Sequence, residues 1–83
     1  MRFEMIDDHS QLLDVFDDEA AALAGVRALL AEEPDAAAEV ALMAFDETDD
    51  DRLVGRALYG DALTEAARTG SLAAMDLASR SHA

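Results

Sequence analysis

The chain has 83 residues and no cysteine, and its 19 acidic residues against six arginines give a formal net charge of −13. This length fits one domain near the lower limit for folding around a single core. Without disulfides, oligomerisation is the expected source of extra stability, so we expect a homodimer. A surface this acidic repels phosphate, which argues against direct nucleic-acid or anionic-membrane binding, whereas a basic protein partner is attracted.

The amino terminus, MRFEMIDD, turns acidic within a few residues and has no apolar stretch of the signal-peptide type. No uncharged run in the chain approaches the roughly 18 residues that a membrane span needs. We therefore expect a cytoplasmic protein.

The chain begins with two segments typical of a β-hairpin. Residues 2–6 alternate, with Phe3 and Met5 on one face, as in a half-buried strand. After a polar turn, residues 11–16 are again rich in strand-favouring side chains. We therefore predict a hairpin over residues 2–16.

The most regular element is an amphipathic helix over residues 17–33. Its apolar side chains recur at the i, i+3, i+4, i+7 spacing and so share one stripe, made of Ala22, Leu23, Val26, Leu29 and Leu30. Asp17 or Asp18 can cap the amino end by accepting hydrogen bonds from first-turn amides. Pro34 disfavours a helical residue before it, so the helix should end there.

The face of this helix opposite the apolar stripe is unusually small. Small side chains let another backbone approach closely, as at a helix–helix contact. The alternative is a plain exposed alanine surface, because alanine is the best helix former. The first interpretation predicts that this face binds a partner through Ala21, Ala24, Gly25 and Ala28.

The stretch after Pro34 is ambiguous between helix and strand. Residues 40–45 are apolar at both alternating sets of positions, as in a strand covered on both faces, but so short a run does not separate strand from helix by period alone. We favour a brief helical turn, a strand over 40–45, an acidic turn at 46–51 and a return strand over 52–59. Gly55 then marks a bulge or a close approach of another segment.

The carboxyl-terminal part contains a second, shorter helix and a weakly patterned end. Gly60 and Asp61 punctuate and cap a helix over residues 62–68. We expect residues 69–83 to form a flexible tail or a short helix that docks on a partner. Its predicted partner anchors are Leu72, Met75 and Leu77.

These elements together predict an α+β fold of order β-β-α-β-β-α, within one domain over residues 1–68. Two β-hairpins join into one antiparallel sheet, and the long helix packs on one face of it. An all-α protein is the alternative, because the chain is rich in alanine and residues 50–59 also fit a helical period.

Three segments resemble a recurrent pattern in small, uncharacterised bacterial α+β proteins. They are FDDEAAALAGVRALL at 16–30, VALMAFD at 40–46 and LVGRALYGDAL at 53–63. In that pattern a hairpin precedes a capped helix, and a second hairpin ends in a glycine-containing helix start. The resemblance covers residues 3–68 and supports the strand interpretation of residues 40–58, but it implies no activity and no site residues.

The acidic turn at residues 46–51 offers oxygen ligands suited to Ca²⁺ or Mg²⁺. Its spacing does not fit a calcium-binding EF-hand loop, because Asp51 stands where that loop requires glycine and Ala57 stands where it requires a bidentate glutamate. A solvated turn explains the charge run better, and we expect no metal and no cofactor.

A metal site or a Ser/His/Asp catalytic set is suggested, in residue type only, by Asp7, Asp8, His9, Ser10 and Asp14. A catalytic triad needs separate elements that aim three groups at one point, and neighbours in a single turn do not provide this. The chain also lacks cysteine, lysine and a glycine-rich phosphate loop. We therefore predict that the protein is not an enzyme.

Two functional hypotheses follow from the sequence. The first is a non-catalytic acidic protein-interaction module, an antitoxin-like inhibitor or adaptor that covers a basic partner surface. The alternative is a structural homo-oligomer whose acidity serves only solubility.

Overall fold

The computed structural model describes residues 1–77, which form one antiparallel sheet with two α-helices packed against it. The strands are β1 (Arg2–Asp7), β2 (Leu12–Phe16), β3 (Val40–Asp46) and β4 (Arg52–Tyr59). The α-helices are α1 (Glu19–Glu32) and α2 (Asp61–Thr69). Three short 3₁₀ turns complete this part of the chain: η1 (Pro34–Ala38), η2 (Glu47–Asp49) and η3 (Ala73–Met75).

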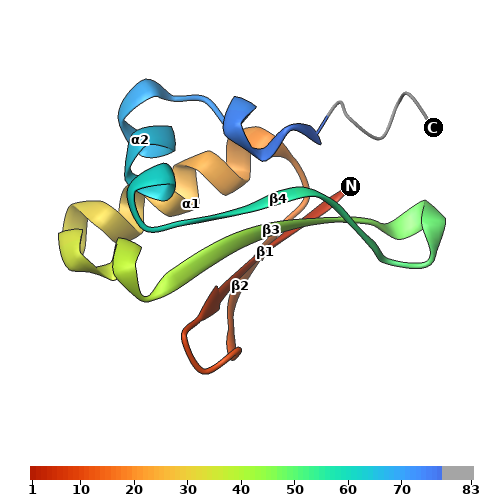
Figure 1. Ribbon diagram of the computed structural model, residues 1–83, viewed down its shortest axis with the longest axis horizontal. Helices are drawn as coiled ribbons and strands as arrows, with labels where there is room; N and C mark the ends of the chain where they lie inside the picture. The colour runs from red at the N-terminus through yellow and green to blue at the C-terminus, as the bar shows by residue number, and fades with distance from the viewer. Residues whose placement is uncertain (78–83) are drawn as a thin grey trace.

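The strands lie in the order β2-β1-β3-β4, and each neighbouring pair is antiparallel. The two hairpins are therefore joined side by side through β1 and β3, and α1 connects them. Both α-helices lie on the same side of the sheet (Figure 1). The predicted α+β fold is confirmed, and the all-α alternative is wrong, because residues 40–46 and 52–59 are strands.

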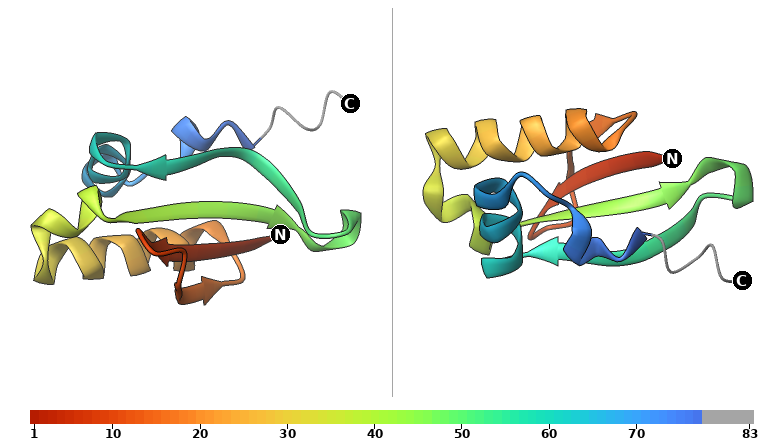
Figure 2. Two further views of the ribbon diagram at one scale, coloured as in Figure 1. Left: turned by 60° about the horizontal axis from the view of Figure 1, so that its bottom comes forward. Right: turned by 90° about the horizontal axis from the view of Figure 1, so that it is seen from above.

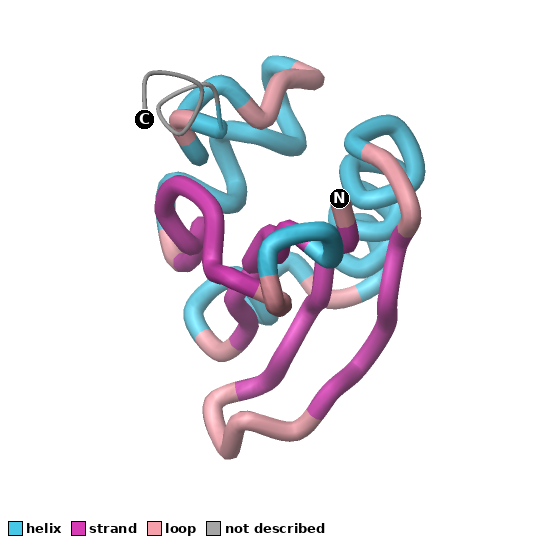
Figure 3. The backbone as a smooth tube through the Cα atoms, turned by 90° about the vertical axis from the view of Figure 1, so that its right-hand side faces the viewer, coloured by secondary structure: helices cyan, strands magenta, loops and turns pink. Residues whose placement is uncertain are grey.

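One face of the sheet supplies half of the hydrophobic core. Phe3 pairs with Ala44 and Met5 with Leu42, and all four side chains are buried beneath the helices. Seen from above, α2 and η3 lie over β3 and β4 (Figure 2, right). The β1–β2 hairpin extends away from the helices (Figure 3), so most of β2 is exposed.

Helix α1 begins and ends as the sequence predicts. The carboxylate of Asp18 accepts a hydrogen bond from the backbone amide of Ala21 at 2.7 Å, which satisfies one of the unpaired first-turn donors. Pro34 follows directly after the residue that ends the helix. The predicted apolar stripe faces the core: Ala22 and Val26 are fully buried, and the three leucines of the stripe are half-buried.

Strand β4 is irregular at Gly55. Its pairing with β3 shifts register opposite Met43, and Gly55 has a φ of 65°. A Cβ atom at this position would lie 2.0 Å from the carbonyl oxygen of Met75, in η3. Only glycine allows both the positive φ and this approach, so the prediction of a bulge or a close approach at Gly55 is confirmed on both counts.

Helix α2 differs from its prediction in how it starts. Asp61 is the first helical residue, and the capping position belongs to Gly60, which has no side chain to accept a first-turn amide. Asp61 still lies in the first turn, where a carboxylate suits the helix dipole. Gly70, at a φ of 71°, ends the helix in the left-handed conformation and turns the chain back over the sheet.

The segment after α2 packs into the core of its own chain, which corrects the expectation of a flexible or partner-docking tail from residue 69. Leu72 and Met75 are 4% and 0% exposed and pack in the same cluster as the sheet and helices. The sequence shows no extended periodic pattern of apolar residues here, because the segment makes only one 3₁₀ turn. The end of the predicted tail, residues 78–83, lies outside the described residues.

The contact between Gly55 and η3 can be tested with a matched pair of glycine substitutions. Gly55→Ala and Gly70→Ala both place a side chain at a positive φ, which costs about 1 kcal/mol. Only Gly55→Ala also forces a Cβ into backbone, so it should lower the free energy of unfolding by roughly 1–3 kcal/mol more. Urea denaturation measures both, and equal losses would show that η3 does not pack on β4.

Candidate interaction surfaces

The face of the sheet turned away from the helices is open to solvent (Figure 2, left). The strand register gives three rows of side chains across it. One row is Leu12, Ile6, Ala41 and Tyr59, the second is Val15, Glu4 and Met43, and the third is Arg2, Phe45 and Leu53. We call these ten residues the open face, and eight of them are apolar.

The two charged residues of the open face neutralise each other. Arg2 donates a hydrogen bond to the Glu4 carboxylate at 2.8 Å and another to Asp51 at 2.9 Å. The hydrogen bond to Asp51, and secondarily the one to Glu4, raise the pKa of Arg2. The guanidinium also lies over the ring of Phe45, 5.2 Å from its centre.

The other acidic residues lie mostly on helices and turns, with Asp7, Asp14 and Asp46 in strands. All 19 are in the described part of the chain, where only Asp46 is buried and only Glu4 and Asp7 are half-buried. Arginine pairs with four of them within residues 1–77, among them Glu65, whose pKa is lowered by its hydrogen bond from Arg68. Most of the negative charge is thus exposed without a paired cation in that range.

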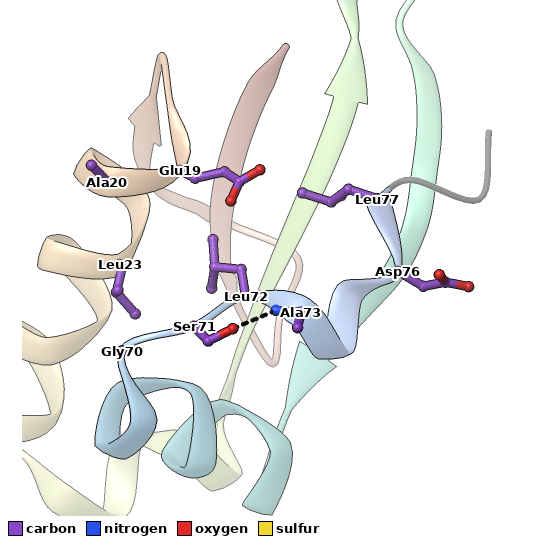
Figure 4. A pocket seen from close by; sticks show the side chains of 9 residues that line it. All are labelled: Glu19, Ala20, Leu23, Gly70, Ser71, Leu72, Ala73, Asp76 and Leu77. Carbon is purple, nitrogen blue, oxygen red and sulfur yellow. Dashed lines mark hydrogen bonds between the residues drawn. The ribbon is translucent and has the colours of Figure 1, made fainter. Parts of the chain in front are cut away.

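A groove of about 650 Å³ lies on the helical side of the molecule, between α1 and the segment that follows α2. Its lining is Glu19, Ala20, Leu23, Gly70, Ser71, Leu72, Ala73, Asp76 and Leu77. Glu19 and Leu77 point toward each other across the groove, with Leu72 between them, whereas the Asp76 carboxylate points away (Figure 4). The groove therefore combines apolar surface with a carboxylate at its edge.

Only part of the predicted small face of α1 is accessible to a partner. Ala21, Ala24 and Ala28 are exposed, as a partner surface requires. Gly25 is covered by the chain itself, because a Cβ there would lie 2.3 Å from the ring of Phe16. The close approach that glycine permits is thus made by a side chain of β2 and not by a second helix.

The three predicted anchors of the carboxyl-terminal segment also differ in accessibility. Leu72 and Met75 belong to the core and are not available to a partner while the segment is folded. Leu77 is half-buried and lines the groove. The structure thus places one of these three residues on an accessible surface.

The residues that suggested catalysis or metal binding lie in or beside turns, except Asp14, which lies in β2. The Asp7 carboxylate accepts hydrogen bonds from the amides of His9 and Gln11 at 2.9 Å each, which fixes the β1–β2 turn. The Asp46 carboxylate accepts from the amide and hydroxyl of Thr48 at 3.0 and 2.6 Å, which caps η2. Within residues 1–77 no group of three or more potential ligands is arranged to hold a metal ion.

None of the helices in the described range has the length and apolar character needed to cross a bilayer. Comparison of the chain with protein-family models, with curated proteins and with solved structures gave no match.

The open face is the feature that sequence reasoning missed. The signal was present in β3, whose residues 40–45 are apolar at both sets of alternating positions and so predict cover on both faces. The exposed side chains of Leu53 and Tyr59, opposite Phe45 and Ala41, extend the apolar surface to β4.

The burial of Met75 predicts that its main role is in folding. Met75→Ala should lower the free energy of unfolding by about 2–5 kcal/mol, because it leaves a cavity among fully buried side chains. Leu77→Ala, at a half-buried position two residues on, should cost less than about 1.5 kcal/mol. Thermal and urea denaturation of both variants give these values, and similar small losses would mean that the segment is not part of the core.

Proposed function

We propose that this protein is a non-catalytic, acidic protein-interaction module that binds a basic segment of a partner protein, in the manner of an antitoxin-like inhibitor or an adaptor. The observation that carries the proposal is the groove between α1 and residues 70–77. It offers apolar contacts from Leu23 and Leu77 and a carboxylate from Glu19, and its lining, within the described residues, contains no basic side chain.

The charge of the whole chain supports the same kind of partner. A net charge of −13, spread mainly over exposed side chains, attracts a basic protein over a distance set by the ionic strength and speeds its association. The groove then supplies the short-range apolar contacts that hold the complex. Binding should accordingly be fast and should weaken as salt is added.

Affinity capture from the native host tests the proposal directly. The immobilised protein should retain a basic protein at about 50 mM NaCl and release most of it at about 500 mM, where screening shortens the reach of surface charges to a few ångströms. Failure to retain any basic protein at low salt would contradict the proposal.

A pair of double variants tests the groove itself. Glu19→Gln with Asp76→Asn removes the carboxylates of two lining residues, of which that of Glu19 points into the groove and that of Asp76 lies at its rim and points away, and asparagine tolerates the positive φ of Asp76. Glu39→Gln with Asp50→Asn removes two exposed carboxylates that do not line it, and Asp50 also has a positive φ. The first variant should weaken binding of the captured protein about tenfold and the second less than about threefold, as measured by calorimetry. Equal losses would mean that net charge alone attracts the partner and that the groove is not its site.

A further inference from the structure

We infer that a second copy of this chain covers the open face of the sheet. The inference begins with β3, one of the two central strands of the sheet. Val40, Leu42 and Ala44 face the helices and are buried, whereas Ala41, Met43 and Phe45 face the other way and are half-buried. A strand with apolar side chains on both faces is typical of a sheet that is covered on both sides.

The apolar surface continues across the neighbouring strands. The exposed fractions of Leu12, Val15, Leu53 and Tyr59 are 56%, 41%, 51% and 69%. An antiparallel sheet with one solvated face normally carries polar side chains there. Contiguous apolar patches of this kind are uncommon on monomeric proteins and mark contact surfaces.

The charge of the open face indicates which partner it fits. Among its ten residues only Arg2 and Glu4 are charged, and they pair with each other at 2.8 Å, so these ten residues carry no net charge, although the chain carries −13. A basic protein gains no carboxylates by docking here. A second copy brings an equally neutral apolar face, and homodimer interfaces are more apolar than interfaces between transient partners.

The size of the face also suits a dimer. Each partner in a standard interface buries roughly 800 Å², about a sixth of this chain's accessible surface of 5216 Å². Four strands at about 4.8 Å spacing, with roughly seven residues of 3.3 Å each, span about 20 Å by 23 Å before the relief of the side chains is counted. One face of the sheet is therefore sufficient to form the centre of such an interface.

The resulting dimer has four layers: helices, sheet, sheet, helices. Two sheets that pack face to face lie about 10 Å apart with interdigitating side chains, and a two-fold axis makes the same patch contact itself. The groove between α1 and residues 70–77 lies on the helical side, so the dimer leaves it open. The inference is thus independent of the proposed function.

Added salt should strengthen this dimer, whereas it should weaken a complex with a basic protein. Two chains of −13 repel each other, while burial of the apolar face draws them together. Added salt screens the repulsion and leaves the apolar contact intact. The dissociation constant should therefore fall as the NaCl concentration rises.

Sedimentation of the whole chain at protein concentrations of about 1–100 μM tests the inference, with two double variants that change the net charge equally. Leu53→Lys with Tyr59→Lys places two cations on the open face at positions that are exposed in the single chain. Ala24→Lys with Ala28→Lys places two on the exposed side of α1, where lysine is a good helix former. Val15→Lys, at the other edge of the open face, is a further variant in case the first does not fold by circular dichroism.

The wild type should be a dimer that tightens several-fold between about 50 and 500 mM NaCl. The open-face variants should raise its dissociation constant at least about tenfold, and the α1 variant should not, although all of them reduce the net negative charge. A dimer that dissociates as salt is added, or one that the α1 variant disrupts and the open-face variants do not, would overturn the inference.

A wild-type monomer at 100 μM in about 500 mM NaCl would also overturn it. If the chain were such a monomer and Leu53→Lys with Tyr59→Lys abolished its binding of the captured basic protein, the open face would be the binding site for that protein. The general proposal of an interaction module would then stand. A salt-strengthened dimer that captured no basic protein would support the inference and remove the proposed function.

Discussion

The structure depends on the need to cover both faces of β3. This strand lies in the middle of the sheet and carries apolar side chains at every position from Val40 to Phe45. Burial of that surface is the main favourable term available to a chain of 83 residues that has no cysteine and so no disulfide. The helices cover one face of β3, and its other face forms the centre of the open face of the sheet.

The covered side shows how an alanine-rich chain builds a core. The two fully buried residues of α1, Ala22 and Val26, are small, so the helix approaches the sheet closely but supplies little apolar area. Larger side chains from outside α1 fill the remaining space: Leu63, Leu72 and Met75 are all nearly or fully buried. The carboxyl-terminal segment can reach this position because Gly70 reverses the chain and Gly55 leaves room for the carbonyl of Met75.

Much of this architecture could be predicted from local chemistry, and the rest could not for a physical reason. Helix α1 has a cap, a periodic stripe and a proline stop, all of which act within its own residues. The segment containing Leu72 and Met75 has only one 3₁₀ turn, so nothing periodic distinguishes a buried from a free segment. Gly25 gave a correct signal of close approach, but a single sequence does not say that the approaching group is the ring of Phe16.

The open face and the rest of the surface differ in charge, and this difference bears on why the chain is acidic. If acidity served solubility alone, the outward positions of β3 and β4 would be the most effective places for carboxylates, because they would replace exposed apolar area directly. Instead the open face has a single carboxylate, Glu4, which is paired with Arg2, while the exposed acids occupy the helices, the turns and, at Asp14, the other side of β2. A neutral apolar face surrounded by an acidic surface is the arrangement that lets like-charged chains associate and still present negative charge outward.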